Sequence, residues 1–424
     1  MSAAPGAAQQ TLPIDSDLAD PLLEAVARSN PGLIALRRAL SAAEARLQAA
    51  GFAPPAVLSG EIEEVPGGTD LSGAGFRIEI GKEFLTGGRS AAARALAAAD
   101  LRSAEAALHA AELRIWAAAA RALTRAIGWS AIERRLASED SLLIGAEEAL
   151  RGRFSVGGAR YTDVLRLRTE RVRVQTDRAE AVAEARVGVA ALEGLLGEGL
   201  PAATPVVTAV YTSAPSAHLL DDLPEPPDLD SLIHRSGRVA MAIVGVERAE
   251  AQRDAVRASQ RPRIAAALGA QRVEAADGGF AIGPTLGLSV TLPFTARRAY
   301  RAEAEAEERA LVAAQAELAA ARAEVRADLV AARTRYEAAR ERLAVFDRAL
   351  LEGVRQERES ALAAYRTGEI SLIELLDFER ALTRAEIERR RAHIDAVLAL
   401  ADLVSGAAGA SQNERGGSSA LSPE

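Results

Sequence analysis

The chain of 424 residues has no cysteine and few aromatic residues. Without cysteine we expect no disulfide bond, no thiol chemistry, no cysteine-ligated metal and no lipid anchor on an N-terminal cysteine. Aromatic residues make up 4% of the chain, so we do not expect a thick core filled by large rings. Alanine, leucine, glutamate and arginine dominate instead, which is typical of long helices that pack along thin seams.

Long apolar runs and an excess of positive charge are also absent. No run of about 18 consecutive apolar residues occurs, which predicts no transmembrane helix. The start Met1-Ser2-Ala3-Ala4-Pro5 lacks a basic region followed by an apolar core. We therefore expect either a cytoplasmic protein or a sequence from which the leader peptide is absent. The net charge of −8, with glutamate interleaved among arginine, predicts solvated helix faces and no nucleic-acid partner.

No catalytic pattern stands out among the residues that carry chemistry. The four histidines lack a second ligand three or four residues away, as a metal site on a helix would need. The pairs Gly87-Gly88 and Gly157-Gly158 lack the strand, loop and Lys-Ser/Thr context of a phosphate-binding loop. We therefore expect no enzyme, no cofactor and no metal site.

Two similar turns interrupt an otherwise helical pattern, and the second lies 211 residues after the first. In each turn an aromatic residue and a glycine precede an acidic residue, an aliphatic residue and a leucine. The two sets are Phe154, Gly157, Asp163, Val164 and Leu165, and then Tyr365, Gly368, Glu374, Leu375 and Leu376. Two copies of one helix–turn–helix tip predict a tandem repeat.

The repeat predicts the organisation of the whole chain. Pro54-Pro55 matches Arg261-Pro262 at an offset of 207, so the two halves also align before their tips. We expect disorder in residues 1–20 and 407–424, and a linker at 198–227. The first repeat is then 21–197, with a β-hairpin at 56–84 and a tip at 154–165. The second is 228–406, with a β-hairpin at 263–293 and a tip at 365–377.

The helical stretches are unusually long for a globular domain. Residues 87–153 contain no proline and predict a helix on the order of 100 Å in length. A helix over 161–196 follows, and Asn30-Pro31 should break the helix that begins at Pro21. In the second half we expect single helices over 232–260, 296–364 and 372–404.

The predicted strands alternate apolar and polar residues, most clearly from Ile282 to Leu292. Four such strands have unpaired edges, and they are too few to close a barrel with a lumen. Several copies of the chain together would close it. The apolar faces would then contact lipid and the polar faces a watery lumen. The predicted fold class is mostly α with a small β part: long helical hairpins plus four strands.

This architecture and both tips resemble the TolC family of outer-membrane efflux proteins. The resemblance covers residues 20–406 and implies a homotrimer with a twelve-stranded transmembrane β-barrel and a periplasmic helical tunnel. It also implies the outer membrane of a Gram-negative bacterium, contact with its lipid, a periplasmic adaptor (membrane fusion) protein and an inner-membrane pump of the resistance–nodulation–division (RND) type. The segments Gly60–Gly68 and Ile78–Arg89 resemble the cobalt–zinc–cadmium efflux branch, which implies heavy-metal cations as substrates.

The tips are the predicted functional sites. Glu374 and Asp377 are spaced i, i+3 and so share one helix face, where copies in a trimer would form stacked carboxylate rings that favour cations. A solvated helix face is the alternative. With Tyr365 and Asp163 they are the predicted pore gate, and Ile370 stands where some relatives have a basic residue that ties the gate shut. The predicted adaptor-docking residues are Val156, Gly157, Gly158, Thr367, Gly368, Glu369 and Leu372.

Three other functions remain open on the sequence. A soluble coiled-coil scaffold would accommodate the missing leader, but it leaves the four alternating strands unexplained. The same fold could instead serve type I protein secretion or the efflux of organic drugs.

Overall fold

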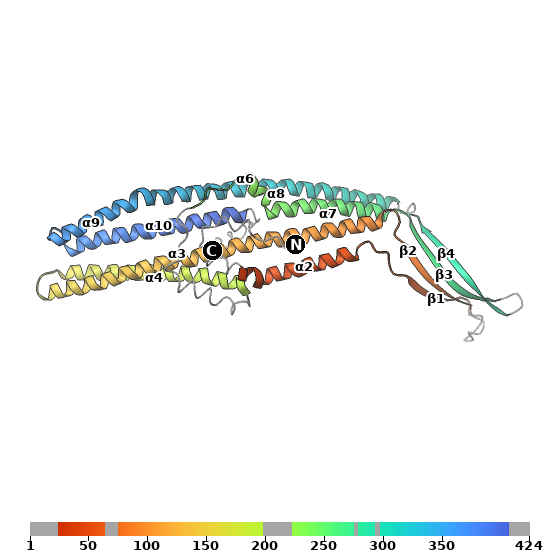
Figure 1. Cartoon of the computed structure of the whole chain (residues 1–424), viewed down its shortest axis with the longest axis horizontal. Coiled ribbons are helices and arrows are strands. Elements are labelled where there is room, and N and C mark those ends of the chain that lie inside the picture. Colours follow the sequence, from red (N-terminus) through yellow and green to blue (C-terminus); the bar gives the residue numbers. More distant parts are fainter. Residues whose placement is uncertain (1–23, 64–74, 198–222, 275–278, 293–296, 407–424) are drawn as a thin grey trace, which may run out of the picture. The chain divides into compact units, whose positions relative to one another are not determined.

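The computed structural model describes residues 24–63, 75–197, 223–274, 279–292 and 297–406 (Figure 1). The expected disordered segments 1–20 and 407–424 and most of the linker 198–227 lie outside these ranges. So do residues 64–74 and 275–278, which lie within the two expected β-hairpins.

The described chain runs twice through a helix, two strands and long helices. In the first half α2 is Pro31–Ala49, β1 Val57–Glu63, β2 Gly75–Phe84, α3 Arg89–Ser155 and α4 Tyr161–Leu196. In the second half α6 is Leu229–Arg235, α7 Gly237–Ser259, β3 Arg263–Glu274, β4 Phe280–Thr291, α8 Arg297–Val345, a π-helix Phe346–Leu350, α9 Leu351–Thr367 and α10 Leu372–Gly406. The predicted class, mostly helical with a small β part, is confirmed.

Each half has a break in the helix before its strands. Asn30 separates the helical residues 24–29 from α2. Its Oδ1 accepts a hydrogen bond from the Leu33 amide (3.1 Å), and Pro31 takes the first helical position, so it is a strong N-cap. The single helix expected over 232–260 is wrong, because Ser236 adopts an extended conformation (φ −63°, ψ 122°) that ends α6.

By contact the chain divides into two compact units. One comprises residues up to 35, 108–239 and 322 onward, and the other comprises 36–107 and 240–321. The helices α3 and α8 contribute residues to both. The two units are described separately below.

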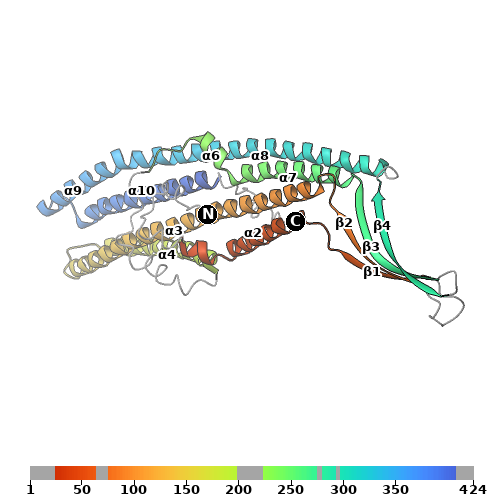
Figure 2. The ribbon, with the colours of Figure 1, turned by 45° about the vertical axis from the view of Figure 1, so that its right-hand side comes forward.

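The second unit contains a four-stranded antiparallel sheet in the order β1-β2-β3-β4, which both Figure 1 and Figure 2 show. Its register pairs even-numbered residues with even-numbered ones in every row, for example Leu58 with Ile80, Ile80 with Leu268, and Leu268 with Leu286. Because side chains alternate between faces, one parity occupies one face of the whole sheet. Even positions are mainly aliphatic or aromatic, and odd positions are mainly polar or small.

The apolar face is the more exposed of the two. Leu286 is 83% exposed and Ile80 52%. On the polar face of β2, the side chains of Arg77 and Glu79 are only 31% and 25% exposed. Arg77 donates to Gln271 Oε1 over 3.1 and 3.3 Å, joining β2 to β3. This pattern is the reverse of that in a water-soluble sheet, which buries its apolar face.

Side chains at the start of α3 hold the ends of α2 and α7. Arg89, whose side chain is 10% exposed, donates to the carbonyl oxygens of Ala258 (3.1 Å), Ser259 (2.6 Å) and Arg261 (2.5 Å) at the end of α7. Ser90 donates to the Gly51 carbonyl just beyond α2 (2.6 Å). These contacts satisfy carbonyl groups that helix ends leave unpaired.

The first unit is built from helical hairpins. Apolar residues of α3 and α4 form its core, and Leu376 and Ile394 of α10 join the same cluster. Charged pairs also join α3 to α4: Glu133 to Arg178 (2.8 Å), Asp140 to Arg171 (3.1 Å) and Glu147 to Arg168 (2.7 Å). The three acidic residues are seven apart, which is the heptad spacing of a coiled coil.

Gly188 of α4 marks a close approach of the two helices. A Cβ atom there would lie 2.6 Å from the Ala126 nitrogen and 2.8 Å from the Ala122 carbonyl oxygen of α3. Only a residue without a side chain fits that contact.

Candidate functional site

The two tips have the same backbone geometry. Gly157 and Gly368 adopt positive φ values of 79° and 81°. In the first tip the Gly158 amide donates to the Arg153 carbonyl (2.8 Å), and in the second the Glu369 amide donates to the Ala364 carbonyl (2.9 Å). Both bonds close a Schellman motif around the left-handed residue, which explains why glycine occupies it.

The first tip presents an apolar end. Phe154 and Tyr161 stack with ring centroids 5.5 Å apart, and Val156 is 82% exposed. Asp163 lies 3.8 Å from Arg160 on the same turn. Arg160 is the N-cap of α4, and its side chain makes no capping bond.

The second tip begins α10 with a capping box. Ser371 Oγ accepts from the Glu374 amide (3.3 Å), and Glu374 Oε2 accepts from the Ser371 amide (2.7 Å). The bonds to the Ser371 backbone and side chain lower the pKa of the Glu374 carboxyl. Glu374 therefore stays charged and turns toward its own backbone.

Asp377 is bound on two sides. Arg166 of α4 donates from Nη2 to both carboxylate oxygens at 3.2 Å, and Arg380 of α10 donates to Oδ1 at 2.8 Å. Arg166 and Asp377 occupy equivalent places in the two tips, 211 residues apart. The two tips are thus joined by opposite charges at matching positions, a pair that the sequence reading did not identify.

The remaining predicted residues differ in exposure. Thr367, Gly368 and Glu369 are exposed, whereas Tyr365 is half-buried. Thr367 Oγ1 donates to the Ala364 carbonyl (3.0 Å). Leu372 is partly buried and packs against the apolar cluster of α3 and α4, so little of it is free for a partner.

Sequence reasoning missed Arg166 and Arg380 as members of this site. The available signal was charge complementarity: aligning the tips places Arg166 opposite Asp377. Arg380 lies one turn after Asp377, where an i, i+3 pair is expected.

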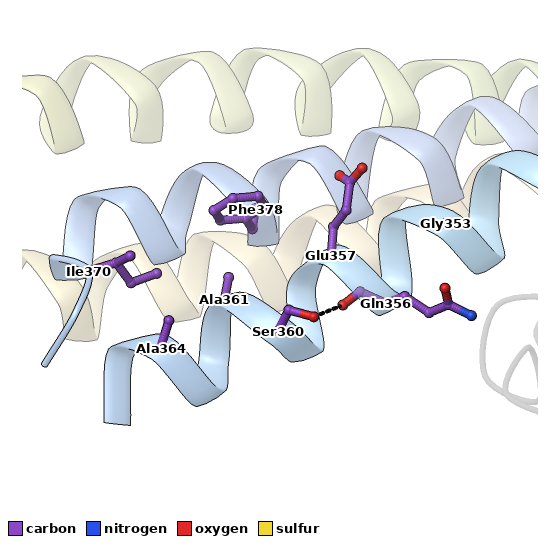
Figure 3. A pocket seen from close by; sticks show the side chains of 8 residues that line it. All are labelled: Gly353, Gln356, Glu357, Ser360, Ala361, Ala364, Ile370 and Phe378. Atoms are coloured by element: carbon purple, nitrogen blue, oxygen red, sulfur yellow. Dashed lines mark hydrogen bonds between the residues drawn. The ribbon is translucent and has the colours of Figure 1, made fainter. Parts of the chain in front are cut away.

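A shallow groove of about 580 Å³ runs beside the second tip between α9 and α10. Figure 3 shows Ala361 and Ala364 of α9 facing Phe378 and Ile370 across it. Gly353, Gln356, Glu357 and Ser360 complete its lining.

The part of the chain that the structure describes contains neither a cluster of metal ligands nor a helix that could span a membrane. No group of three or more His, Cys, Asp or Glu side chains is placed to hold a metal ion. None of the described helices is long and apolar enough to cross a membrane.

Comparison with known proteins gives consistent results. The family model described as outer membrane efflux protein matches residues 229–408. The solved outer-membrane channel OprN is 19% identical, with a TM-score of 0.70 and 97% of each chain covered. A membrane protein from Pseudomonas aeruginosa is 19% identical, with a TM-score of 0.74 over 96% of this chain and 98% of that one. The open state of the MtrE outer membrane channel from Neisseria gonorrhoeae is 17% identical, with a TM-score of 0.70 over 96% and 94%. No curated protein matches the sequence.

At these identities the solved structures establish the fold alone. The chain has the fold of TolC-like outer-membrane channels, with helical tunnel and barrel portions. The family match covers residues 229–408, which is less than half of the chain. The matched family is described as an efflux protein, and OprN and MtrE as outer-membrane channels, in agreement with the expectation that the chain is not an enzyme.

Proposed function

We propose that the chain is an outer membrane efflux protein, and that three copies form the exit duct of a tripartite efflux pump. The observation that carries this proposal is the sheet. Its apolar face is exposed, and this face is built from even-numbered positions in all four strands. A surface of this kind needs a non-aqueous environment.

The length of the apolar face fits a bilayer. Along β2 the face extends from Phe76 to Phe84, about 26 Å at ~3.3 Å per residue. Strands that cross a membrane at a tilt of ~45° are about 9–11 residues long, and the apolar band of an outer-membrane barrel is flanked by aromatic residues. Phe76 and Phe84 stand at the two ends of the strand. Lys82 lies on this face near one end, and its Nζ reaches the Pro54 carbonyl (2.7 Å), as a snorkelling lysine would.

The edges of the sheet favour assembly of several copies. Within the described residues, β1 and β4 each pair on one side only. Joining β4 of one copy to β1 of the next satisfies both edges, and three copies give twelve strands. The polar face, with Arg77 and Gln271, then lines the lumen.

The tips are proposed as the entrance to the duct. Asp377, Glu374 and Asp163 bring negative charge to it, and Tyr365 narrows it. In this arrangement Arg166 offsets the charge of Asp377 and ties the second tip to the first. The contact proposed to hold the entrance closed is therefore the ion pair of Arg166 with Asp377. Ile370 adds no charge at the position where some relatives carry a basic residue.

A periplasmic adaptor is the proposed partner at the tips. The exposed residues proposed for this contact are Val156, Gly157, Gly158, Thr367, Gly368 and Glu369. The groove of about 580 Å³ between α9 and α10 lies beside the second tip. Energy would come from an inner-membrane RND-type pump, because the duct has no chemistry of its own.

Heavy-metal cations are the proposed substrates, on the basis of the resemblance at Ile78–Arg89. Gly87 and Arg89 belong to this resemblance, but both also have structural roles that do not depend on the substrate. Gly87 has a φ of 68° that favours glycine, and Arg89 holds the end of α7. Both would therefore be retained whatever the cargo. Growth of a deletion strain on zinc, cobalt, cadmium and drug panels tests the choice.

The duct itself is tested by reconstitution. We expect the purified chain to require detergent, to have the mass of a trimer and to conduct ions in a planar lipid bilayer. A detergent-free, monomeric chain without conductance would contradict the proposal and favour the coiled-coil scaffold.

A further inference from the structure

The two ends of the sheet differ in charge. One end lies beside the starts of α3 and α8 and the end of α7 (Figure 1). It is formed by residues 80–94, 260–265 and 297–301, which contain eight basic residues and one acidic residue, Glu83. We call these eight the basic patch: Lys82, Arg89, Arg94, Arg261, Arg263, Arg297, Arg298 and Arg301. The patch is a local feature, because the whole chain has a net charge of −8.

Acidic residues are in excess at the opposite end of the same strands. Residues 61–63, 75–79 and 271–274 contain four glutamates and two arginines, which are Glu61, Glu63, Glu79 and Glu274, and Arg77 and Arg272. Positive charge is therefore not a general property of the sheet. It belongs to the end that adjoins the helices.

Hydrogen bonds hold the segments of the basic patch together. Thr86 Oγ1, just before α3, donates to the Pro262 carbonyl at the start of β3 (2.9 Å). Gln260, in the turn after α7, donates to the Tyr300 carbonyl of α8 (2.8 Å). The basic residues come from distant parts of the sequence, but these contacts bring them to one surface.

Half of the basic residues have no partner of their own. Within the described residues, Arg263, Arg297, Arg298 and Arg301 are exposed and make no hydrogen bond or ion pair. Burial lowers the pKa of the Arg89 guanidinium, and the charge of Arg263 lowers it further. The basic patch is thus a group of like charges that an anion would stabilise.

The arginines at the start of α8 are also unfavourable for that helix. A helix N-terminus carries partial positive charge and favours acidic residues. The helices that start at the tips follow this rule, since α4 has Asp163 and α10 has Glu374 in the first turn. The first turns of α3 and α8 contain no acidic residue, and these helices begin with Arg89 and Arg297. Stability of the helices therefore does not explain the basic patch.

Aromatic residues lie between the basic patch and the apolar face. Phe84 ends β2 on that face and is 47% exposed, and Phe52, between α2 and β1, is 70% exposed. Arg94 of the patch donates to the Ala50 carbonyl (3.3 Å), two residues before Phe52. The order of apolar side chains, aromatic rings and basic residues matches the order of acyl chains, interface and headgroups in a bilayer.

We propose that the basic patch docks the headgroups of anionic phospholipids in the membrane leaflet that adjoins the helices. The arginines at the start of α8 bind the lipid phosphates, and Phe52 and Phe84 pack on the acyl chains. This inference rests on the proposed function, since it requires the apolar face of the sheet to lie in a membrane. A lipid matches both parts of the surface, whereas a soluble anion would leave the exposed rings uncovered.

The test is native mass spectrometry of the full chain in detergent, titrated with dioleoyl-phosphatidylglycerol or dioleoyl-phosphatidylcholine. Both lipids carry a phosphate and the same acyl chains, but only phosphatidylglycerol has a net negative charge. We expect the unmodified chain to prefer it. The double variant Arg297→Gln with Arg301→Gln should reduce this preference by about 25-fold at low salt, because each arginine near an anionic membrane surface contributes about fivefold. The preference should also fall as salt is added.

The matched control is Arg322→Gln with Arg335→Gln. It removes two exposed arginines further along α8, and it should keep the lipid preference. Equal losses in both double variants would overturn the proposal, because the effect would then follow net charge alone. Displacement of phosphatidylglycerol by inorganic phosphate at equal ionic strength would assign the patch to a soluble anion. A loss of trimer with unchanged lipid preference would assign it to acidic residues of a neighbouring copy.

Failure of this inference is distinguishable from failure of the duct. A trimer that conducts ions but binds the two lipids equally would overturn the lipid surface and leave the duct standing. A monomer without conductance would overturn the duct.

Discussion

Two buried glutamates on α3 have carboxyl pKa values that are shifted in opposite directions. Glu139 is 8% exposed and Glu147 5%. Burial raises the pKa of Glu139. The hydrogen bond from Arg168 lowers the pKa of Glu147, with Arg151 and Arg171 adding to it. Both glutamates are buried, so the hydrogen bond from arginine, and not burial, decides whether the pKa is raised or lowered.

Replacing each by glutamine should therefore change stability in opposite directions. The raised pKa of Glu139 costs stability at neutral pH and costs nothing below the ordinary glutamate value of about 4.3. Glu139→Gln should raise the melting temperature at pH 7, with the gain lost in acid. Glu147→Gln should destabilise by about 1 kcal/mol at pH 7, because the half-exposed Arg151 and Arg168 lose their charged partner, whereas Arg171 keeps Asp140. That loss should shrink as pH falls below about 4. Thermal unfolding between pH 3 and 8 measures both, and a common sign at pH 7 would contradict the assignment.

Two glycines of α4 offer a matched pair. Gly188→Ala would press a methyl group into the backbone of α3, and we expect a loss of about 2 kcal/mol. Gly194→Ala meets nothing within 4 Å and should stabilise by about 0.5 kcal/mol, since alanine favours the helix. Denaturant unfolding of the two variants compares them. A tolerated Gly188→Ala would mean that α3 and α4 do not approach so closely.

Much of the tip was predictable, but its bonding was not. The glycine positions follow from local sequence, because a Schellman motif needs a left-handed residue. The spacing of Glu374 and Asp377 also predicted a shared helix face. The capping box of Ser371 with Glu374 and the i, i+3 pair of Asp377 with Arg380 were also available as local signals, but they were not used. The contact of Arg166 with Asp377 comes from helix packing, which a single sequence does not encode locally.

At the level of elements, the long helix of the second half differs from that of the first. The halves align at an offset of 207 before the strands and 211 at the tips, so the second carries four extra residues between these points. The structure has a π-helix at Phe346–Leu350 where an unbroken helix over 296–364 was expected, so that expectation was wrong. A π-turn absorbs an extra residue without shifting the helix phase that follows. The apolar periodicity of a long sequence window is hardly changed by one such turn. The π-helix was therefore not predicted.

The π-helix makes a deletion test possible. Removing Ala349 should convert the π-turn into an α-turn and lower the melting temperature by less than about 5 °C. Removing Ala339, inside α8, should be far more damaging. It would rotate Tyr336, whose hydroxyl donates to the Pro224 carbonyl (2.6 Å), by about 100° relative to Arg342, which pairs with Asp395 (2.5 Å). Thermal unfolding followed by circular dichroism compares the two variants. Equal losses in melting temperature would show that the π-turn does not absorb the deletion.

At the scale of the whole molecule, the exposed apolar face of the sheet indicates a non-aqueous environment. The alternation in the strands predicted both faces and the need for further copies. It could not give the register that places every even position of all four strands on one face, because strands far apart in the sequence must be paired first. The proposed tunnel and barrel likewise depend on neighbouring copies of the chain, which a single sequence does not describe.

Adjacent residues of β4 should respond very differently to charge. Leu288, 73% exposed, lies on the apolar face, and Ser289, also exposed, lies on the other. Leu288→Arg should cost about 2 kcal/mol in the membrane and reduce the yield of inserted trimer, whereas Ser289→Arg should insert normally. Heat-modifiable gel mobility of membrane fractions measures the yield. Equal yields would argue that this face does not contact lipid.

The shared parity of the strands also constrains how the gene can change. Between Phe84 and Ile264 the chain passes through α3, α4, α6 and α7, yet both residues face the same side of the sheet. Within a strand, an insertion or deletion of one residue exchanges the side chains of the apolar and polar faces from that point on. Tolerated length changes inside the strands of related genes should therefore come in steps of two codons, a rule that does not apply to the turns.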